Sequence, residues 1–301
     1  MSLDFIFFEP NRARVWVPAG GSGSVDVFDL GKREFARIEG FATAEHEAHG
    51  KKRVMGPSSG AVGDGVVYVG NRANKQVCMV DTQTLKQGAC VELAAPPDCV
   101  EYVARSREVW VTTPSAHSLA IIETAAGAKF GAVSTLSMPG EPEGYAVDEP
   151  RGLFLTNLED RGSTLAVDVK SRSIKSTWEA GCGPDGPRGI AVDSAHSFVF
   201  VACTDHVQVL DSANRGARLG VLDTGAGLDN IDYVPSTGSL YAAAGKAARL
   251  TIARLEGHGE LKVIASVATA PGARNAVADA KGNVYLTDGQ GANLLRVAAP
   301  E

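Results

Sequence analysis

Two histidines three residues apart are the first side chains in this sequence that could perform chemistry. His46 and His49 lie in the segment 44–49, whose residues are adequate helix formers, with Thr43 as a cap and Gly50 as a stop. In a helical turn both imidazoles would lie on one face, where they could bind Zn²⁺ or Cu²⁺ or act as a general base. The alternative is a solvated polar loop, because two histidines at this spacing also occur by chance.

Charged residues form a second group, at one recurring position before seven short apolar runs. Copy by copy, this position reads Asp4, Ser59, Asp98, Glu143, Arg188, Asp229 and Arg274. The guanidinium groups of Arg188 and Arg274 could bind the carboxylate or phosphate of a small anionic substrate. The alternative is structural, because Asp residues before strands often cap turns and acid–Arg pairs can neutralise each other.

Oxygen ligands for a divalent cation, Ca²⁺ or Zn²⁺, are the most specific chemistry in this group. The expected metal ligands are Asp98, Glu143, Asn157 and Asp229. A cation there would polarise a carbonyl, and His46, His49 or Glu143 would activate water. The expected substrate-binding residues are Arg188, Arg274, Asn71, His117 and His206.

A sevenfold repeat must position these residues. An apolar, β-rich run with an aromatic residue at its peak recurs along the chain, followed by a turn and a second alternating run. The aromatic residues are Trp16, Tyr68, Trp110, Phe154, Phe200, Tyr241 and Tyr285, spaced 41 to 52 residues apart. We expect each of them to pack in the core between repeats.

Four short strands in every ~40–45 residues are typical of the blade of a β-propeller. The sequence therefore predicts an all-β, seven-bladed β-propeller that forms one domain over residues 1–301. The last copy stops early, so its blade would have three strands. A pair of sandwiches would explain the composition, but not one aromatic register along the whole chain.

The repeat also predicts which loops share a face. Chain direction alternates from strand to strand, so the loop before each innermost strand and the loop after each second strand lie at the same end of a blade. Both groups of candidate residues map to these loops. The fold therefore predicts one polar face on which they meet.

At this point the sequence resembles a known family. Tyr68-Val69-Gly70-Asn71, Phe154-Leu155-Thr156-Asn157 and Tyr285-Leu286-Thr287-Asp288 are similar to the repeat of the bacterial YVTN propellers. That group resembles the seven-bladed phosphogluconolactonases and, more distantly, the gluconolactonase and senescence-marker group. The resemblance implies the fold and a leaning toward lactone hydrolysis, but a fold does not determine a function.

Composition and charge argue against several classes of partner and against a membrane span. The chain has 29 basic and 35 acidic residues, a net charge of −6, which argues against a nucleic-acid or membrane-surface partner. It contains no apolar run of the ~18–20 residues that span a bilayer, and no leader is evident at the N-terminus. We expect a cytoplasmic monomer whose partner is a small anionic molecule or a protein.

The five cysteines predict a reducing compartment with mostly buried thiols. Cys78 and Cys90 could face each other across a hairpin, so one disulfide between them remains an alternative. Cys99 and Cys182 map to the predicted polar face, as nucleophiles, as soft metal ligands or as inert buried thiols.

Two functions fit these observations. The first is a metal-assisted hydrolase of small anionic lactones or esters. The second is a non-enzymatic propeller scaffold that uses the same face to bind a ligand or a protein. Metal content and lactone turnover would distinguish the two.

Overall fold

The chain folds into antiparallel β-sheets joined by short turns. A computed structural model describes residues 3, 5–48 and 51–300. Contacts divide the chain into two compact units, Met1–Pro139 and Gly140–Glu301. The expectation of a single domain over residues 1–301 stays a prediction.

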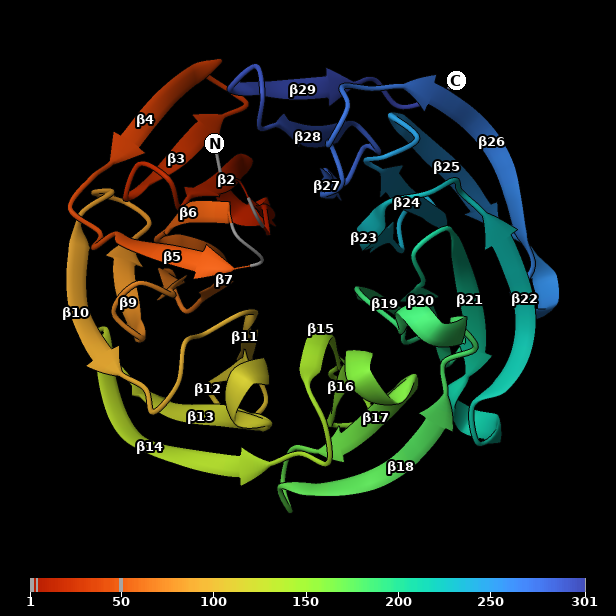
Figure 1. Ribbon diagram of the computed structural model, residues 1–301, viewed down its shortest axis with the longest axis horizontal. Helices are drawn as coiled ribbons and strands as arrows, with labels where there is room; N and C mark the ends of the chain where they lie inside the picture. The colour runs from red at the N-terminus through yellow and green to blue at the C-terminus, as the bar shows by residue number, and fades with distance from the viewer. Residues whose placement is uncertain (1–2, 4, 49–50, 301) are drawn as a thin grey trace. The chain divides into compact units, whose positions relative to one another are not determined.

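The first unit contains three four-stranded sheets and a hairpin (Figure 1). The first sheet consists of β1 (Phe7–Glu9), β2 (Arg14–Ala19), β3 (Ser24–Asp29) and β4 (Glu34–Ile38). The second consists of β7 (Pro57–Gly63), β8 (Val66–Asn71), β9 (Gln76–Asp81) and β10 (Gln87–Glu92). The third consists of β11 (Val100–Val103), β12 (Glu108–Thr113), β13 (Ser118–Ala125) and β14 (Lys129–Ser137). The hairpin pairs β5 (Ala44–Ala48) with β6 (Lys51–Met55).

The second unit contains three four-stranded sheets and one three-stranded sheet. The fourth sheet consists of β15 (Pro142–Asp148), β16 (Leu153–Leu158), β17 (Ser163–Asp168) and β18 (Ser173–Glu179). The fifth consists of β19 (Ile190–Asp193), β20 (Phe198–Ala202), β21 (His206–Asp211) and β22 (Ala217–Asp223). The sixth consists of β23 (Leu228–Val234), β24 (Ser239–Ala244), β25 (Arg249–Leu255) and β26 (Leu261–Ala268). The last consists of β27 (Ala276–Ala278), β28 (Val284–Asp288) and β29 (Asn293–Val297).

These seven sheets are the blades of a seven-bladed β-propeller, numbered 1 to 7 in chain order, which confirms the predicted fold class and the three-stranded last blade. The helices in the described residues are single 3₁₀ turns: η1 (Pro10–Arg12), η2 (Pro114–Ala116), η3 (Glu159–Arg161), η4 (Gly183–Asp185), η5 (Ser212–Asn214) and η6 (Gly257–Gly259). None of the helices in this part of the chain is long and apolar enough to cross a membrane.

The aromatic repeat forms the core, as predicted. All seven aromatic residues lie on the second strand of a blade, and none is more than 3% exposed. Their neighbours are aliphatic residues of adjacent blades: Tyr68 packs with Val100 and Val111, for example, and Phe200 with Leu228 and Ile231. A single blade cannot bury both of its faces, so the repeated aromatic residues hold the blades of each unit together.

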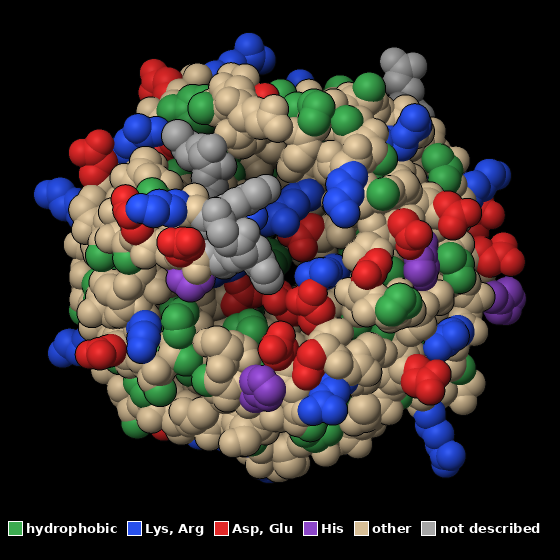
Figure 2. All heavy atoms as spheres, viewed as in Figure 1, with side chains coloured by type: hydrophobic (Ala, Val, Ile, Leu, Met, Phe, Trp, Pro, Cys, Tyr) green, Lys and Arg blue, Asp and Glu red, His purple; other side chains and the backbone are tan. Residues whose placement is uncertain are grey.

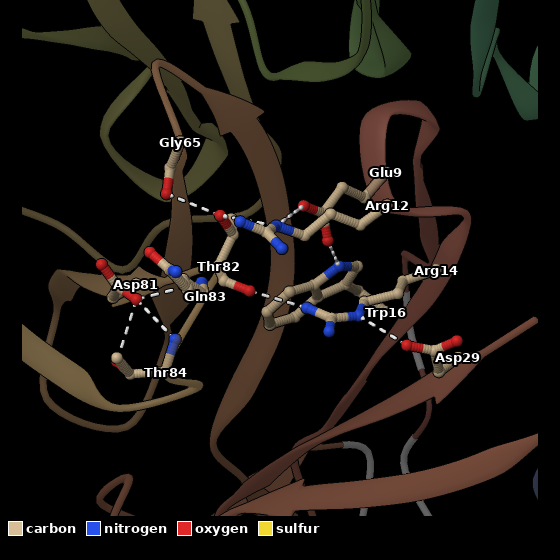
Figure 3. A network of polar contacts seen from close by, with 10 residues as sticks. All are labelled: Glu9, Arg12, Arg14, Trp16, Asp29, Gly65, Asp81, Thr82, Gln83 and Thr84. Carbon is tan, nitrogen blue, oxygen red and sulfur yellow. Dashed lines mark hydrogen bonds and ion pairs between the residues drawn. The ribbon is translucent and has the colours of Figure 1, made fainter. Parts of the chain in front are cut away.

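Buried polar groups also join neighbouring blades (Figure 3). Trp16 donates its indole N–H to Glu9 Oε2 at 2.9 Å, and Arg12 Nε lies 3.5 Å from the other carboxylate oxygen. Burial raises the pKa of Glu9 above its usual range, although these contacts oppose the shift. Arg14 donates to the backbone oxygen of Thr82 at 2.6 Å, which links blade 1 to blade 2.

Acids at the ends of third strands cap turns. The side chains of Asp29, Asp81, Asp168 and Asp211 each accept backbone N–H groups two or three residues ahead. These N–H groups lower the pKa of Asp29, Asp81 and Asp168 below the usual range. These carboxylates therefore serve the turns.

The predicted helix at residues 44–49 is wrong. Residues 44–48 form strand β5, in which His46 pairs with Arg53 of β6. The physical reason is length: a six-residue helix must nucleate with few hydrogen bonds, whereas a hairpin gives each strand a partner. His49 lies outside the described residues.

Candidate functional site

Backbone contacts between neighbouring blades position the start of each inner strand. The N–H of Gly189 donates to the carbonyl of Asp229 at 2.8 Å, and the N–H of Asn230 donates to the carbonyl of Arg274 at 3.4 Å. In the first unit, the N–H of Phe5 donates in the same way to Ser58 at 3.0 Å. We call Ser58, Asp98, Glu143, Arg188, Asp229 and Arg274 the inner-strand start positions.

The contact with Phe5, together with the strand register, corrects the predicted Ser59 by a single residue. The core aromatic Tyr68 pairs with Ala61, three residues after Ser58, as Tyr241 pairs with Asp232, three residues after Asp229. Ser58 is therefore the equivalent residue, and the predicted Ser59 follows it. Ser59 donates its hydroxyl to the carbonyl of Asp98 at 2.5 Å, so it links blade 2 to blade 3.

Close backbone approach explains the glycines that follow two start positions. A Cβ on Gly144 would lie 2.2 Å from the carbonyl oxygen of Arg188. A Cβ on Gly189 would lie 2.5 Å from the side-chain oxygen of Asn230. Only glycine allows neighbouring inner strands to meet this closely.

Ion pairs hold four of the charged start residues. Asp98 pairs with Arg72, which follows β8 of the preceding blade. Arg188 pairs with Glu159, which follows β16 of the preceding blade, at 2.5 Å. Arg274 Nε lies 3.2 Å from Asp229 Oδ2, so these two start residues pair with each other.

These pairs differ in their exposure to solvent. The Asp98 side chain is only 10% exposed, whereas that of Arg274 is 50% exposed. Asp98 is therefore part of a buried pair, and Arg188 and Arg274 are the start residues whose cationic groups a ligand could reach. Figure 2 shows charged side chains of both signs on one face of the molecule, with hydrophobic side chains scattered among them.

The side chains of the two candidate asparagines donate hydrogen bonds to backbone carbonyls. Asn157 is fully buried, and its amide donates to the carbonyl of Arg188 at 2.6 Å and that of Gly189 at 3.2 Å. Asn71 donates to the carbonyl of Ala42 at 3.0 Å. Both amides thus fix the loops that follow the second strands, and their role in binding stays a prediction.

The remaining predicted residues lie on three different elements. Glu143 is half-buried on β15, and His46 is exposed on the hairpin strand β5. His117 is exposed and adopts a left-handed conformation at the end of η2, with φ of 48°. Their predicted roles remain untested.

His206 is a candidate histidine whose ring contacts a carboxylate. Its Nδ1 lies 2.6 Å from Asp205 Oδ1, and its Nε2 lies 3.4 Å from the amide nitrogen of Gln208. A carboxylate on Nδ1 fixes the tautomer whose Nε2 accepts a proton, which is the arrangement of a general base.

Among the described residues, no group of three or more His, Cys, Asp or Glu side chains is placed to hold a metal ion. A cation bound by Asp98 or Asp229 would have to compete with Arg72 and Arg274 for the carboxylates. The amide oxygen of Asn157 already accepts the hydroxyl of Thr164 at 2.7 Å. Three of the four predicted ligands, Asp98, Asp229 and Asn157, thus have other partners, and the metal stays a proposal.

The cysteines correct the sequence analysis. Cys78 and Cys90 form the disulfide that the predicted hairpin allowed, and Cys182 forms a second disulfide with Cys203. The prediction of buried thiols is wrong for Cys182 and Cys203, and Cys182 is neither a nucleophile nor a metal ligand while bonded. Cys99 keeps its thiol, outside both disulfides, and it is buried.

Sequence reasoning missed Arg72, Glu159 and Asp205. A signal for the first two was present, because Arg72 and Glu159 follow the repeated second strands, and these loops share a face with the inner-strand start positions. A signal for the second disulfide was present too, since Cys182 and Cys203 flank the same blade at that end. Asp205 carried no signal beyond its place next to His206.

Comparisons with known proteins show the fold alone. No protein-family model matches the chain, and neither does any curated protein. Hydrazine synthase from Kuenenia stuttgartiensis matches 99% of this chain and 95% of its own, with 14% identity and a TM-score of 0.80. A chain of the mitotic checkpoint complex matches 99% of this chain and 87% of its own, with 14% identity and a TM-score of 0.77. Virginiamycin B lyase from Staphylococcus aureus matches 95% of this chain and 91% of its own, with 10% identity and a TM-score of 0.71.

These identities are too low to carry a function. The similar structures include chains of enzymes and a component of a protein complex, so the fold alone does not distinguish an enzyme from a binding protein. The resemblance to the YVTN propellers stays a prediction, because no family model matches.

Proposed function

We propose that this protein is a non-enzymatic binding propeller that recognises acidic groups of a protein partner through two inner-strand start positions of its second unit, Arg188 and Arg274. The observation that carries the proposal is the two ion pairs Arg188–Glu159 and Arg274–Asp229. Each pair fixes a charged side chain in the unbound protein. Fixed side chains lose little entropy on binding, which favours recognition.

Arg188 and Arg274 are the proposed contacts. Their side chains are 30% and 50% exposed, so an incoming carboxylate can reach them. A guanidinium carries five N–H donors, so an arginine in an ion pair can bind a second carboxylate. The likeness to a chain of the mitotic checkpoint complex supports a protein partner, since that chain works within an assembly.

Crosslinking and affinity purification test this proposal. The Arg188→Ala, Arg274→Ala double variant should lose the partner that the wild-type protein recovers. The Arg254→Ala variant, which removes an exposed arginine from β25, should keep it. Equal recovery by the double variant would contradict the proposal.

Hydrolysis of a small anionic lactone or ester is a second candidate, favoured by the contact of 2.6 Å between Asp205 and His206. In this function His206 would remove a proton from water, while Asp205 would hold its tautomer. The role expected for His206 from the sequence was substrate binding, so this assignment is new. A divalent cation belongs to this candidate, and elemental analysis of the purified protein tests it.

Lactone turnover separates the two functions. A hydrolase should lose turnover in His206→Gln and Asp205→Asn and keep it in the surface variant His258→Gln. If the wild-type protein turns over no lactone, the second candidate is wrong and the binding function is unaffected.

The cellular location is part of the proposal. A cytoplasmic location was expected, but two disulfides persist more readily in an oxidising compartment. We therefore propose that the protein works in an oxidising compartment. Fractionation of cells that express the untagged protein tests this.

A further inference from the structure

Blade 7 lacks the outer strand that the other six blades have. Its sheet runs β27-β28-β29, and within the described residues no strand pairs with the outer edge of β29 (Figure 1). In every other blade an antiparallel fourth strand of five to nine residues covers the third strand. Residues 298–300, which follow β29, are not in a strand.

The missing strand leaves the third strand of blade 7 exposed. In blade 6, β25 buries Leu250, Ile252 and Ala253 completely. The strand register equates these residues with Leu294, Arg296 and Val297 of β29. Leu294 and Val297 are only half-buried, and Arg296 is exposed. An apolar strand edge of this kind is a template for another strand.

The positive charge of Arg296 indicates that an added fourth strand would place an acidic residue opposite it. It occupies the position at which blade 6 buries Ile252 and blade 5 buries Val209, and its guanidinium donates to Asn283 at 2.6 Å. In blade 1, a third and a fourth strand are joined by a bidentate ion pair, between Asp26 and Arg37. An acid on an added strand could pair with Arg296 in the same way.

We propose that the outer edge of β29 binds an extended segment of another protein, which completes blade 7 as an antiparallel fourth strand with apolar residues in alternation and an acid opposite Arg296. In each of the other six blades, a fourth strand of this chain occupies the equivalent edge. Backbone hydrogen bonds would supply the affinity, while Leu294, Val297 and Arg296 would select the side chains. The site is separate from the inner-strand start positions, so the proposal stands independently of the proposed function.

A peptide derived from β26 provides the probe. Ala265 of β26 pairs with Ile252, so the equivalent peptide residue would oppose Arg296. Two fluorescent peptides of the sequence Leu261–Ala268 carry Glu or Lys at this position, and a third carries Pro in place of Ser266. Fluorescence anisotropy with the full chain measures their binding.

The Glu peptide should bind the wild-type protein at least tenfold more tightly than the Lys peptide, and the Pro peptide should not bind. The Arg296→Glu variant should reverse the preference between the two charges. A variant with the Glu peptide sequence appended after Glu301 should fill the edge itself and bind none of the peptides, which also controls for non-specific association.

Absence of binding by the Glu peptide, or equal binding by the appended variant, would overturn the proposal. Sedimentation of the wild-type protein tests a different occupant. A dimer that the appended strand abolishes would identify the occupant as a second copy of this chain, and the assignment to another protein would be wrong.

Discussion

Burial of the Asp232 side chain destabilises the folded protein when its carboxylate is charged. It lies half-buried on the inner strand β23, where its Oδ2 accepts the backbone N–H of Ala278 at 2.8 Å. Burial raises the pKa of Asp232 from 3.8 to about 6, although this N–H and that of Tyr233 oppose the shift. Because the folded pKa is the higher one, its contribution to stability is fully present below pH 3.8 and is lost as the pH rises through about 6.

The Asp232→Asn variant should therefore stabilise the protein at neutral pH. An amide oxygen can still accept the N–H of Ala278, and no charge needs to be buried. A rise of the pKa from 3.8 to about 6 corresponds to ~2–3 kcal/mol. Urea unfolding should show this gain at pH 7.5 and little of it near pH 4. The exposed control Asp223→Asn should show no such pH dependence, and an equal effect of both variants would contradict the argument.

The buried ion pair Asp98–Arg72 should be worth more than a surface pair. Removing Arg72 leaves a carboxylate that is only 10% exposed without that cation. The Arg72→Ala variant should lose ~2–4 kcal/mol of unfolding free energy. The matched control Arg218→Ala breaks a pair with Glu179 whose side chains are 50% and 90% exposed, and it should lose less than ~1 kcal/mol. Chemical denaturation measures both, and similar losses would show that burial does not govern these pairs.

At the scale of elements, the sequence predicted the blades but not the roles of their loops. The aromatic residues on the second strands repeat because each must fill the same space between neighbouring blades. The candidate residues in the loops carried no such constraint. Whether Asp98 binds a cation or Arg72 depends on what the preceding blade presents, and that is visible only when the loops are in place.

The hairpin β5–β6 also formed against the prediction from local sequence. Alanine and glutamate favour helices, so local propensity pointed to a helix in 44–49. Pairing with residues 51–55 overrode that propensity. Propensity is a weak guide in a segment this short, because tertiary partners decide its structure.

The disulfide between Cys182 and Cys203 should stabilise blade 5. It joins the loop before β19 to the residue after β20, with a separation of 21 residues. Closing a loop of this length is worth about 3 kcal/mol in the chain-entropy description. The Cys182→Ser, Cys203→Ser double variant should lose about this much in chemical denaturation, whereas the exposed control Asp223→Asn, in the same blade, should lose less than ~0.5 kcal/mol.

Thiol labelling of the denatured wild-type protein checks that the bonds exist. One thiol per chain, that of Cys99, should react without reductant, and all five cysteines should react after reduction. Five reactive thiols without reductant would contradict both disulfides.

At the scale of the whole molecule, the distribution of tryptophan allows the single-domain prediction to be tested. Trp16 and Trp110 lie in the unit Met1–Pro139, and Trp178 lies in the unit Gly140–Glu301. A Trp178→Phe background therefore makes fluorescence report on the first unit alone. Phe200 is fully buried in the second unit, so Phe200→Ala should cost ~3–5 kcal/mol there.

If the 301 residues form one cooperative domain, Phe200→Ala will lower the denaturation midpoint seen by Trp16 and Trp110 as much as the midpoint seen by far-ultraviolet circular dichroism. We expect this result, because a propeller repeat depends on its neighbours to bury its faces. If the tryptophan midpoint does not move while the circular dichroism splits into two transitions, the units unfold independently and the chain has two domains. Tyr68→Ala in the first unit is the matched control, since it must shift the tryptophan midpoint in either case.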